Sequence, residues 1–280
     1  MSPNTDRRLV CLLAVIALGA VALAAHDTWL VPATFKVTAG QPVSVALNTS
    51  EDFPTSDSPA QPDRIETFVA VTAEGRVEVS GYRVEGNSLV ADVTPGHGLT
   101  LVAAVTKPRL IVLEEKDFNT YITEEGLDFI VAARAARGQS FSAGRERYSK
   151  VAKLVLCADD KTDDKRRYRT AIGGRLEIVP LTNPCGLRAG DTLAVQVVFE
   201  GRPLAGAWVG AGTEGTHGHH YPFRQRTDAD GRALVRVDRP GPWFVRALHM
   251  VPLTEFNDAD PPEDWASWQS WFSTLTFGVE

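Results

Sequence analysis

Short segments in which apolar and polar residues alternate recur along most of the chain. Val43, Val45 and Leu47 alternate with smaller or polar residues, which is typical of a strand with one buried face. Further segments of this kind follow at short spacing, with turn signals such as Pro95-Gly96 between them. Many short strands with frequent turns predict a β-sandwich, which we place at residues 26–113.

The pattern changes after this first sandwich. Residues 114–123 and 127–137 have a helical composition, the second with apolar residues three to four apart and with Gly138 as a stop signal. We therefore expect two short helices within an insert at residues 114–145.

Strand patterns return in the second half of the chain. Residues 151–156 suit a strand, although Tyr148, Val151 and Leu154 also fit a helix, and we favour the strand. Three later segments resemble parts of carboxypeptidase regulatory or transthyretin-type domains: Gly201–Val209, Thr227–Arg232 and Trp243–Ala247. The predicted fold class is all-β, with a second Ig-like or carboxypeptidase-regulatory-like sandwich at residues 146–280.

A secretory leader precedes the first strand. Arg7 and Arg8 form a basic start, residues 9–23 are an unbroken apolar run, and small residues follow. The run is short for a membrane span, which needs about 20 residues. We expect cleavage after Ala24 or Ala25, and hence a periplasmic or secreted protein with no stable membrane insertion.

The charge of the chain is acidic. Thirty-five Asp and Glu residues against 29 Lys and Arg give a formal net charge of −6, and loss of Asp6, Arg7 and Arg8 with the leader makes it −7. An acidic chain without a basic cluster is a poor partner for nucleic acid. We therefore expect no nucleic-acid partner.

Two cysteines follow the leader, Cys157 and Cys185. In an oxidising compartment one pair favours a disulfide, and a closed loop of this length contributes about 3 kcal/mol. The alternative is two unpaired buried thiols. Their spacing does not fit a CxxC metal or redox site.

The leader junction places a histidine next to the new amino terminus. Cleavage after Ala25 makes His26 the first residue, so that its α-amine and imidazole can chelate copper or nickel together. The alternative is a polar residue that keeps the junction accessible to the processing enzyme. Asp27 can add an oxygen ligand or orient an imidazole as its hydrogen-bond partner.

Three more histidines, His217, His219 and His220, lie in a glycine-flanked segment. Neutral imidazoles suit Ni, Cu, Zn and Co, and an extended backbone would point the first two to the same side. The alternative is an exposed polar hairpin tip. His249 near the end of a strand is, taken alone, a buried histidine hydrogen-bonded to the backbone, and His97 is a turn residue.

Several strings, in this order and spacing, resemble an exported bacterial family of unknown function whose members are often labelled NikM-like and assigned to periplasmic nickel or cobalt uptake. The strings are His26–Leu30, Phe118–Tyr121, Arg145–Lys150, Pro203–Ala207, Arg226–Gly231, Val245–Met250 and Leu275–Phe277. Members tend to have an aromatic residue where Asn183-Pro184-Cys185 stands, so a disulfide would be peculiar to this protein and its relatives.

The resemblance implies a metal site, because its strings include His26 and His249. We expect His26 to pack near His249, with the loop at residues 217–220 closing the site around Ni, Co or Cu. An inner-membrane metal transporter is the partner that the resemblance implies.

Two other functions are compatible with parts of the sequence. Trp265, Trp268 and Trp271 are three residues apart, as in a carbohydrate platform, which would suit an adhesion or ligand-binding sandwich without metal. Packing of a short amphipathic turn on the sandwich is the interpretation we favour for them. The sequence lacks GxSxG, HExxH and phosphate-loop motifs, so we expect no enzyme. A histidine-brace copper oxidoreductase is the least favoured alternative.

Overall fold

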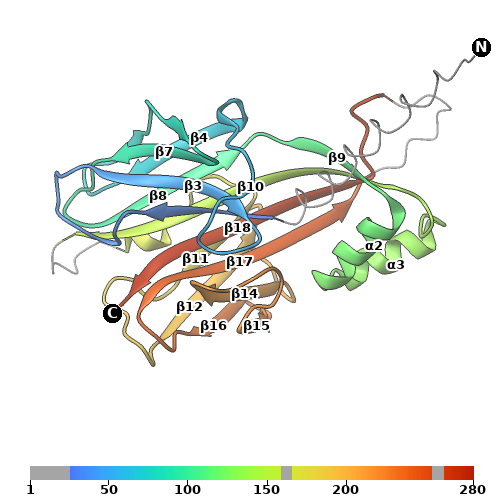
Figure 1. The fold of residues 1–280 in the computed structure, drawn as a ribbon. Coiled ribbons are helices and arrows are strands. Elements are labelled where there is room, and N and C mark those ends of the chain that lie inside the picture. Colours follow the sequence, from blue (N-terminus) through green and yellow to red (C-terminus); the bar gives the residue numbers. More distant parts are fainter. Residues whose placement is uncertain (1–25, 159–165, 254–261) are drawn as a thin grey trace, which may run out of the picture.

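The computed structural model describes residues 26–158, 166–253 and 262–280. Its strands form three sheets, and two helices lie together at one end of the longest strands (Figure 1). The first sheet has the order β1 (Asp27–Pro32), β3 (Val43–Ser50), β7 (Ser88–Val93), β6 (Arg83–Glu85). The third contains β11 (Leu176–Pro180), β12 (Thr192–Phe199), β13 (Arg202–Pro203) and β16 (Arg232–Arg236).

The second sheet, called the large sheet below, has ten strands. Eight of them follow one another in the order β15 (Phe223–Arg226), β14 (Trp208–Thr213), β17 (Gly241–Pro252), β18 (Trp268–Val279), β10 (Gly144–Ala158), β8 (Gly98–Thr106), β4 (Ile65–Val71), β5 (Arg76–Glu78). The other two, β2 (Lys36–Val37) and β9 (Arg109–Leu113), pair with β10 outside this path. The pair β10 and β18 is parallel, whereas β17 and β18 are antiparallel. Strands from both halves of the chain therefore meet in one continuous sheet.

The large sheet is covered on both faces, which makes β10 apolar on both sides. Val151 and Val155 lie in the core shared with β11 and β12, while Ala152, Leu154 and Leu156 lie in the core shared with β3 and β7. Successive side chains of a strand point to opposite faces, so a strand buried on both faces needs an almost continuous apolar run. The run at residues 151–156 is thus a strand, as the sequence favoured.

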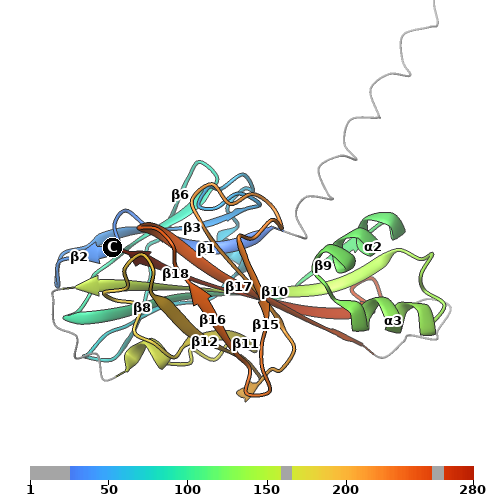
Figure 2. The same cartoon turned by 90° about the horizontal axis from the view of Figure 1, so that it is seen from below.

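The helical insert forms a third core at the far end of the long strands (Figure 2). Its helices are α2 (Glu115–Glu124) and α3 (Asp128–Ala136), within a residue or two of the ranges expected from sequence. Phe118, Ile122 and Ile130 pack there on Trp268 and Phe272 of β18. Short 3-10 turns at Pro62–Arg64 and Arg167–Arg169 complete the regular structure described.

The all-β fold class with a helical insert is confirmed, and the large sheet joins the two sandwiches. β10 links β8 and β4 of the first half to β18 and β17 of the second. The domain boundaries proposed from sequence stay a prediction. In the described part of the chain no helix has the length and apolar character needed to cross a bilayer.

The tryptophan spacing belongs to a strand and not to an amphipathic turn. Trp268 and Trp271 both lie on β18, where residues three apart face opposite sides, and they are buried in two different cores. The expected packing in the core is therefore present, while a shared aromatic platform is not. Elsewhere, Cys157 at the end of β10 is joined to Cys185 by a disulfide with an S–S distance of 2.02 Å.

Candidate functional site at the amino-terminal histidine

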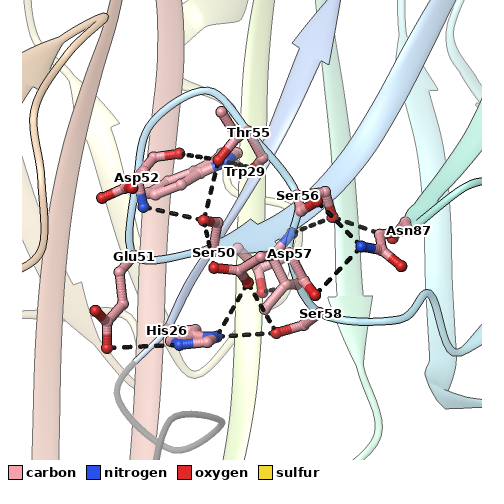
Figure 3. A network of polar contacts seen from close by, with 12 residues as sticks. His26, Trp29, Ser50, Glu51, Asp52, Thr55, Ser56, Asp57, Ser58 and Asn87 are labelled. Carbon is pink, nitrogen blue, oxygen red and sulfur yellow. Dashed lines mark hydrogen bonds and ion pairs between the residues drawn. The ribbon is translucent and has the colours of Figure 1, made fainter.

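His26 lies directly before β1 and is 5% exposed. Because β1 pairs with β3 in the register Asp27 to Ser50, the histidine lies beside the segment that follows β3. Its Nδ1 is 2.9 Å from the hydroxyl of Ser58 and 3.5 Å from a carboxylate oxygen of Asp57. Its Nε2 is 3.5 Å from a carboxylate oxygen of Glu51 (Figure 3). Both ring nitrogens thus face an acidic side chain.

The segment that supplies these carboxylates is held by its own hydrogen bonds. The Ser50 hydroxyl donates to the carboxylate of Asp57 over 3.0 Å, and the amide of Asn87 donates to the carbonyl of Asp57 over 3.2 Å (Figure 3). The indole N–H of Trp29 donates to the carbonyl of Thr55 over 3.2 Å. Contacts from β1, β3 and the start of β7 therefore fix the position of Asp57 relative to His26.

Burial keeps the imidazole of His26 neutral. Loss of hydration lowers its pKa below the usual value, and the nearby carboxylates of Asp57 and Glu51 oppose this only in part. Neutral imidazole is the form that binds transition metals. A metal ion could therefore bind this imidazole near neutral pH without displacing a proton from an imidazolium.

Lys150 of β10 fixes the backbone of the same residue. Its ammonium donates to the carbonyl of His26 over 2.5 Å, and burial lowers the pKa of Lys150 to about 7. Glu146 lies four residues before Lys150, on the same face of β10. Its carboxyl accepts hydrogen bonds from the hydroxyls of Ser270 and Tyr121, and burial raises its pKa to about 7. One oxygen of this carboxyl has no hydrogen-bond partner among the described residues.

Asp27 forms an ion pair with the side chain of Arg246. Arg246 of β17 contacts the carboxylate of Asp27 at 3.0 Å and forms two hydrogen bonds with Glu125, at 2.5 and 2.9 Å. All three side chains are buried. The guanidinium of Arg246 is shared by the two carboxylates, so Asp27 already has a cationic partner, and its expected role as a metal ligand stays a prediction.

The three clustered histidines diverge, because their segment is a turn and not an extended strand. His217 contacts Asp52 at 2.9 Å, His219 turns inward to Glu125 at 3.3 Å, and His220 is exposed. Gly218 adopts a φ of +54°, and its N–H donates to the carbonyl of Glu51 over 3.0 Å. The turn therefore lies against the segment that flanks His26, and only His217 stays close to it.

His249 lies on the other face of the large sheet. Arg246 points to the face that carries Asp27, so His249, three residues along the same strand, points to the opposite one. Its ring lies 4.5 Å from that of Phe199 on β12. The structure thus does not bring His249 to His26, contrary to the arrangement expected from sequence.

Several residues of this site were not singled out from sequence. Glu51, Asp57 and Ser58 belong to a loop whose composition is merely polar, and only strand pairing brings them to His26. Arg246 gave a clearer signal, since it is a charge inside a mostly apolar strand, whereas Lys150 lies in a strand with several other charged residues. Across residues 26–158, 166–253 and 262–280, no group of three or more His, Cys, Asp and Glu side chains is arranged to hold a metal ion.

A family model for a domain of unknown function, DUF4198, matches residues 23–251. The chain belongs to this DUF4198 family. The match begins just before His26, includes the first sandwich and the helical insert, and ends within β17, before β18. Family membership says nothing about nickel or cobalt, and no curated protein gives a significant match.

Solved structures similar to this DUF4198 chain include β-rich domains of very low identity. The D0-D1 domain of intimin is 12% identical, with 89% of this chain and 96% of that chain covered and a TM-score of 0.19. The *Escherichia coli* adhesin FdeC is 14% identical, with 91% and 63% covered and a TM-score of 0.25. An *Escherichia coli* alpha-2-macroglobulin fragment is 10% identical, with 80% and 96% covered and a TM-score of 0.21. Such TM-scores support no argument about function.

Proposed function

We propose that this protein is exported and binds a transition metal ion, Ni, Co or Cu, at its processed amino terminus, as a component of metal uptake or handling. The observation that supports the proposal is the environment of His26. Its imidazole is buried and neutral, and a carboxylate oxygen lies 3.5 Å from each ring nitrogen. Ligands that share one ion at about 2.1 Å are about 3.4 Å apart in a tetrahedral site. The spacing is therefore suited to an ion between them.

The two sides of the ring have different roles in this proposal. The α-amine released by cleavage after Ala25 can reach only Nδ1 of its own ring, so the ion lies on the side of Asp57. Amine, Nδ1 and the Asp57 carboxylate then form the ligand set, next to the Ser58 hydroxyl. Glu51 accepts from Nε2 on the other side, as carboxylates commonly do for metal-bound histidines.

The amine is essential to this set, since the side chains alone supply too few ligands. A nitrogen-rich set of this kind favours Cu(II) and Ni(II) over Co(II). Lys150 helps by holding the carbonyl of His26, which keeps the terminus in place. Transfer of the ion to an inner-membrane transporter is part of the proposal.

Calorimetric titration of the processed protein, freed of metal by a chelator, with Ni, Co, Cu(II) and Zn tests the proposal. We expect one site per chain, about 100-fold weaker binding in His26→Ala and about tenfold weaker binding in Asp57→Asn. A form that retains Ala25 should bind at least about tenfold more weakly, because its amine is displaced. His220→Ala, an exposed histidine of the nearby turn, is the matched control and should bind as the native protein does. Equal binding by His26→Ala would refute the proposal.

A binding or adhesion module without metal is the second candidate. Four apolar side chains in and beside the helical insert are exposed: Val112, Phe129, Val131 and Phe141, the last at 91%. Exposed apolar groups of this kind occur at interaction surfaces. Trp268 and Trp271 take no part, because they are buried. Partner binding that is unaffected by chelator and lost in Phe141→Ser would favour this candidate.

A further inference from the structure

A cavity of about 390 Å³ lies at the edge of β17, and we name it the β17-edge pocket. β14 pairs with β17 only from Trp243 to Ala247, so beyond this point no strand of the described residues lies beside this edge of β17. The turn between α2 and α3 and the segment before β14 form the other walls. The lining side chains used below are Leu127, Phe129, Ala207, Trp208, Leu248 and His249. The pocket thus forms where the sheet ends and the helical insert begins.

The walls of this pocket are mostly apolar, and two of their neutral polar groups, the ring of His249 and the buried indole N–H of Trp208, have no hydrogen-bond partner among the described residues. Its ring lies 4.5 Å from that of Phe199 and 6.1 Å from that of Phe129. Burial lowers the pKa of His249, so the imidazole is neutral near neutral pH. The ring makes no hydrogen bond to any described residue, and one nitrogen of a neutral imidazole donates while the other accepts.

The two cations that line the β17-edge pocket are already paired with carboxylates. Arg226 contacts Asp128 at 2.7 Å, and Arg246 contacts Glu125 at 2.5 Å and Asp27 at 3.0 Å. An anionic ligand would lose its hydration without gaining a free cation, and a cationic ligand would compete with these guanidinium groups for their carboxylates. The pocket therefore favours a neutral ligand.

We propose that the β17-edge pocket binds a neutral small molecule that has an aromatic ring and one hydrogen-bonding group. The volume is within the range of small-molecule sites, which are mostly apolar with a few placed polar groups. The ring of the ligand lies against Phe129, Leu127 and Leu248, and its polar group pairs with His249. The site wraps around the edge of β17, with Leu248 on the face of Arg246 and His249 on the opposite face. It uses none of the proposed metal ligands and is independent of the metal proposal.

Titration of the folded protein with indole, followed by amide chemical shifts in NMR spectra, tests this inference. We expect saturable binding with a dissociation constant of about 0.1–1 mM and shifts at Gly126, Leu248 and His249. Benzoate, an aromatic anion of similar size, should bind at least about tenfold more weakly. No saturable indole binding, or equal binding of benzoate, would overturn the proposal.

Variants of the lining separate this pocket from any other site. Ala207→Leu fills the cavity and should weaken indole binding at least about tenfold, and His249→Phe, which keeps a ring but removes the hydrogen bond, about tenfold. Phe129→Ala, at a half-exposed position that does not endanger the fold, should also weaken binding several-fold. Leu234→Ala, an exposed change on β16, is the control. Unchanged binding in both Ala207→Leu and Phe129→Ala would show that indole binds elsewhere.

Discussion

The two faces of the large sheet bury charged side chains in different ways. On the face covered by β11, Lys153 forms an ion pair with Glu177, which also accepts three backbone N–H groups at 2.9 to 3.1 Å. On the face covered by β1, Lys150 donates to a single carbonyl, and one oxygen of Glu146 has no partner among the described residues. The charges of Lys153 and Glu177 therefore satisfy each other. Lys150 and Glu146 have fewer partners, so their protonation can respond to pH or to a ligand.

The same comparison extends to two histidines of these faces, His26, which is buried, and His249, which is half-buried. His26 faces Asp57 and Glu51 at 3.5 Å, whereas His249 lies among the rings of Phe199 and Phe129. Both are neutral, but only the first has carboxylates that could share a cation with it. What a buried histidine can bind therefore depends on the face of the strand from which it projects.

Removal of the cation between Asp27 and Glu125 should have the largest effect on stability. Arg246→Met leaves two carboxylates buried without a counter-charge, and we expect the free energy of unfolding to fall by about 3–5 kcal/mol. Urea unfolding followed by circular dichroism measures this loss. Arg239→Met, which removes a fully exposed guanidinium from Asp238, is the control and should leave stability unchanged. A small loss in Arg246→Met would show that water or a bound cation takes the place of the guanidinium.

The next effect concerns the pH dependence of stability on the β1 face. Burial raises the pKa of Glu146 to about 7, so the folded state holds this proton more tightly than the unfolded state. The resulting stabilisation is complete below about pH 4.5 and is lost as the pH rises through 7. Glu146→Gln should remove this decline, on the order of 2–3 kcal/mol between pH 4.5 and 7.

Urea midpoints at a series of pH values between 4.5 and 7 compare this variant with the native protein. Lys150, whose pKa burial lowers to about 7, contributes with the opposite sign, as stability that increases with pH above 7. His26 and His249, whose pKa values burial lowers, also affect stability below pH 7, but both are present in the native protein and in the variant. The difference between the two proteins therefore reports on Glu146. Glu66→Gln, on an exposed side chain of β4, serves as the control, and an equal slope in Glu146→Gln would contradict the expectation.

The smallest effect compares the two histidines directly. His26→Phe loses the contact with Ser58 and places a ring without polar groups between two carboxylates, which should cost about 1–2 kcal/mol. His249→Phe keeps an aromatic ring among aromatic rings and should cost less than about 1 kcal/mol. Thermal unfolding of both variants in the presence of a chelator measures the difference. Equal losses would mean that burial alone, and not the neighbouring groups, determines the behaviour of both histidines.

Local patterns in the sequence predicted the strands and helices well, because each depends on residues close together in the chain. The apolar run at residues 151–156 gave β10, and the three-to-four spacing after Leu127 gave α3. The tryptophan spacing failed for a related reason. A spacing of three places Trp268 and Trp271 on one side of a helix but on opposite sides of a strand.

The candidate site depended on contacts that no local pattern records. His26 was singled out as a metal ligand at the new amino terminus, which stays a prediction, and its neighbours Glu51 and Asp57 follow only from the register of β1 with β3. The pairing of His26 with His249 failed because the face of a strand residue depends on register, and one residue changes it. Arg246, three residues before His249 on β17, lies on the face where His249 was expected to lie.

The position of β18 has a consequence for how the polypeptide acquires its shape during synthesis. This strand follows every other strand of the large sheet in the chain, yet it lies between β17 and β10, and its Thr274 and Thr276 donate to carbonyls of β1. Until β18 is available, the sheet lacks a central strand, and β1 lacks the two hydrogen bonds from Thr274 and Thr276. Both sandwiches must therefore be completed in one late event, after translation of the whole segment.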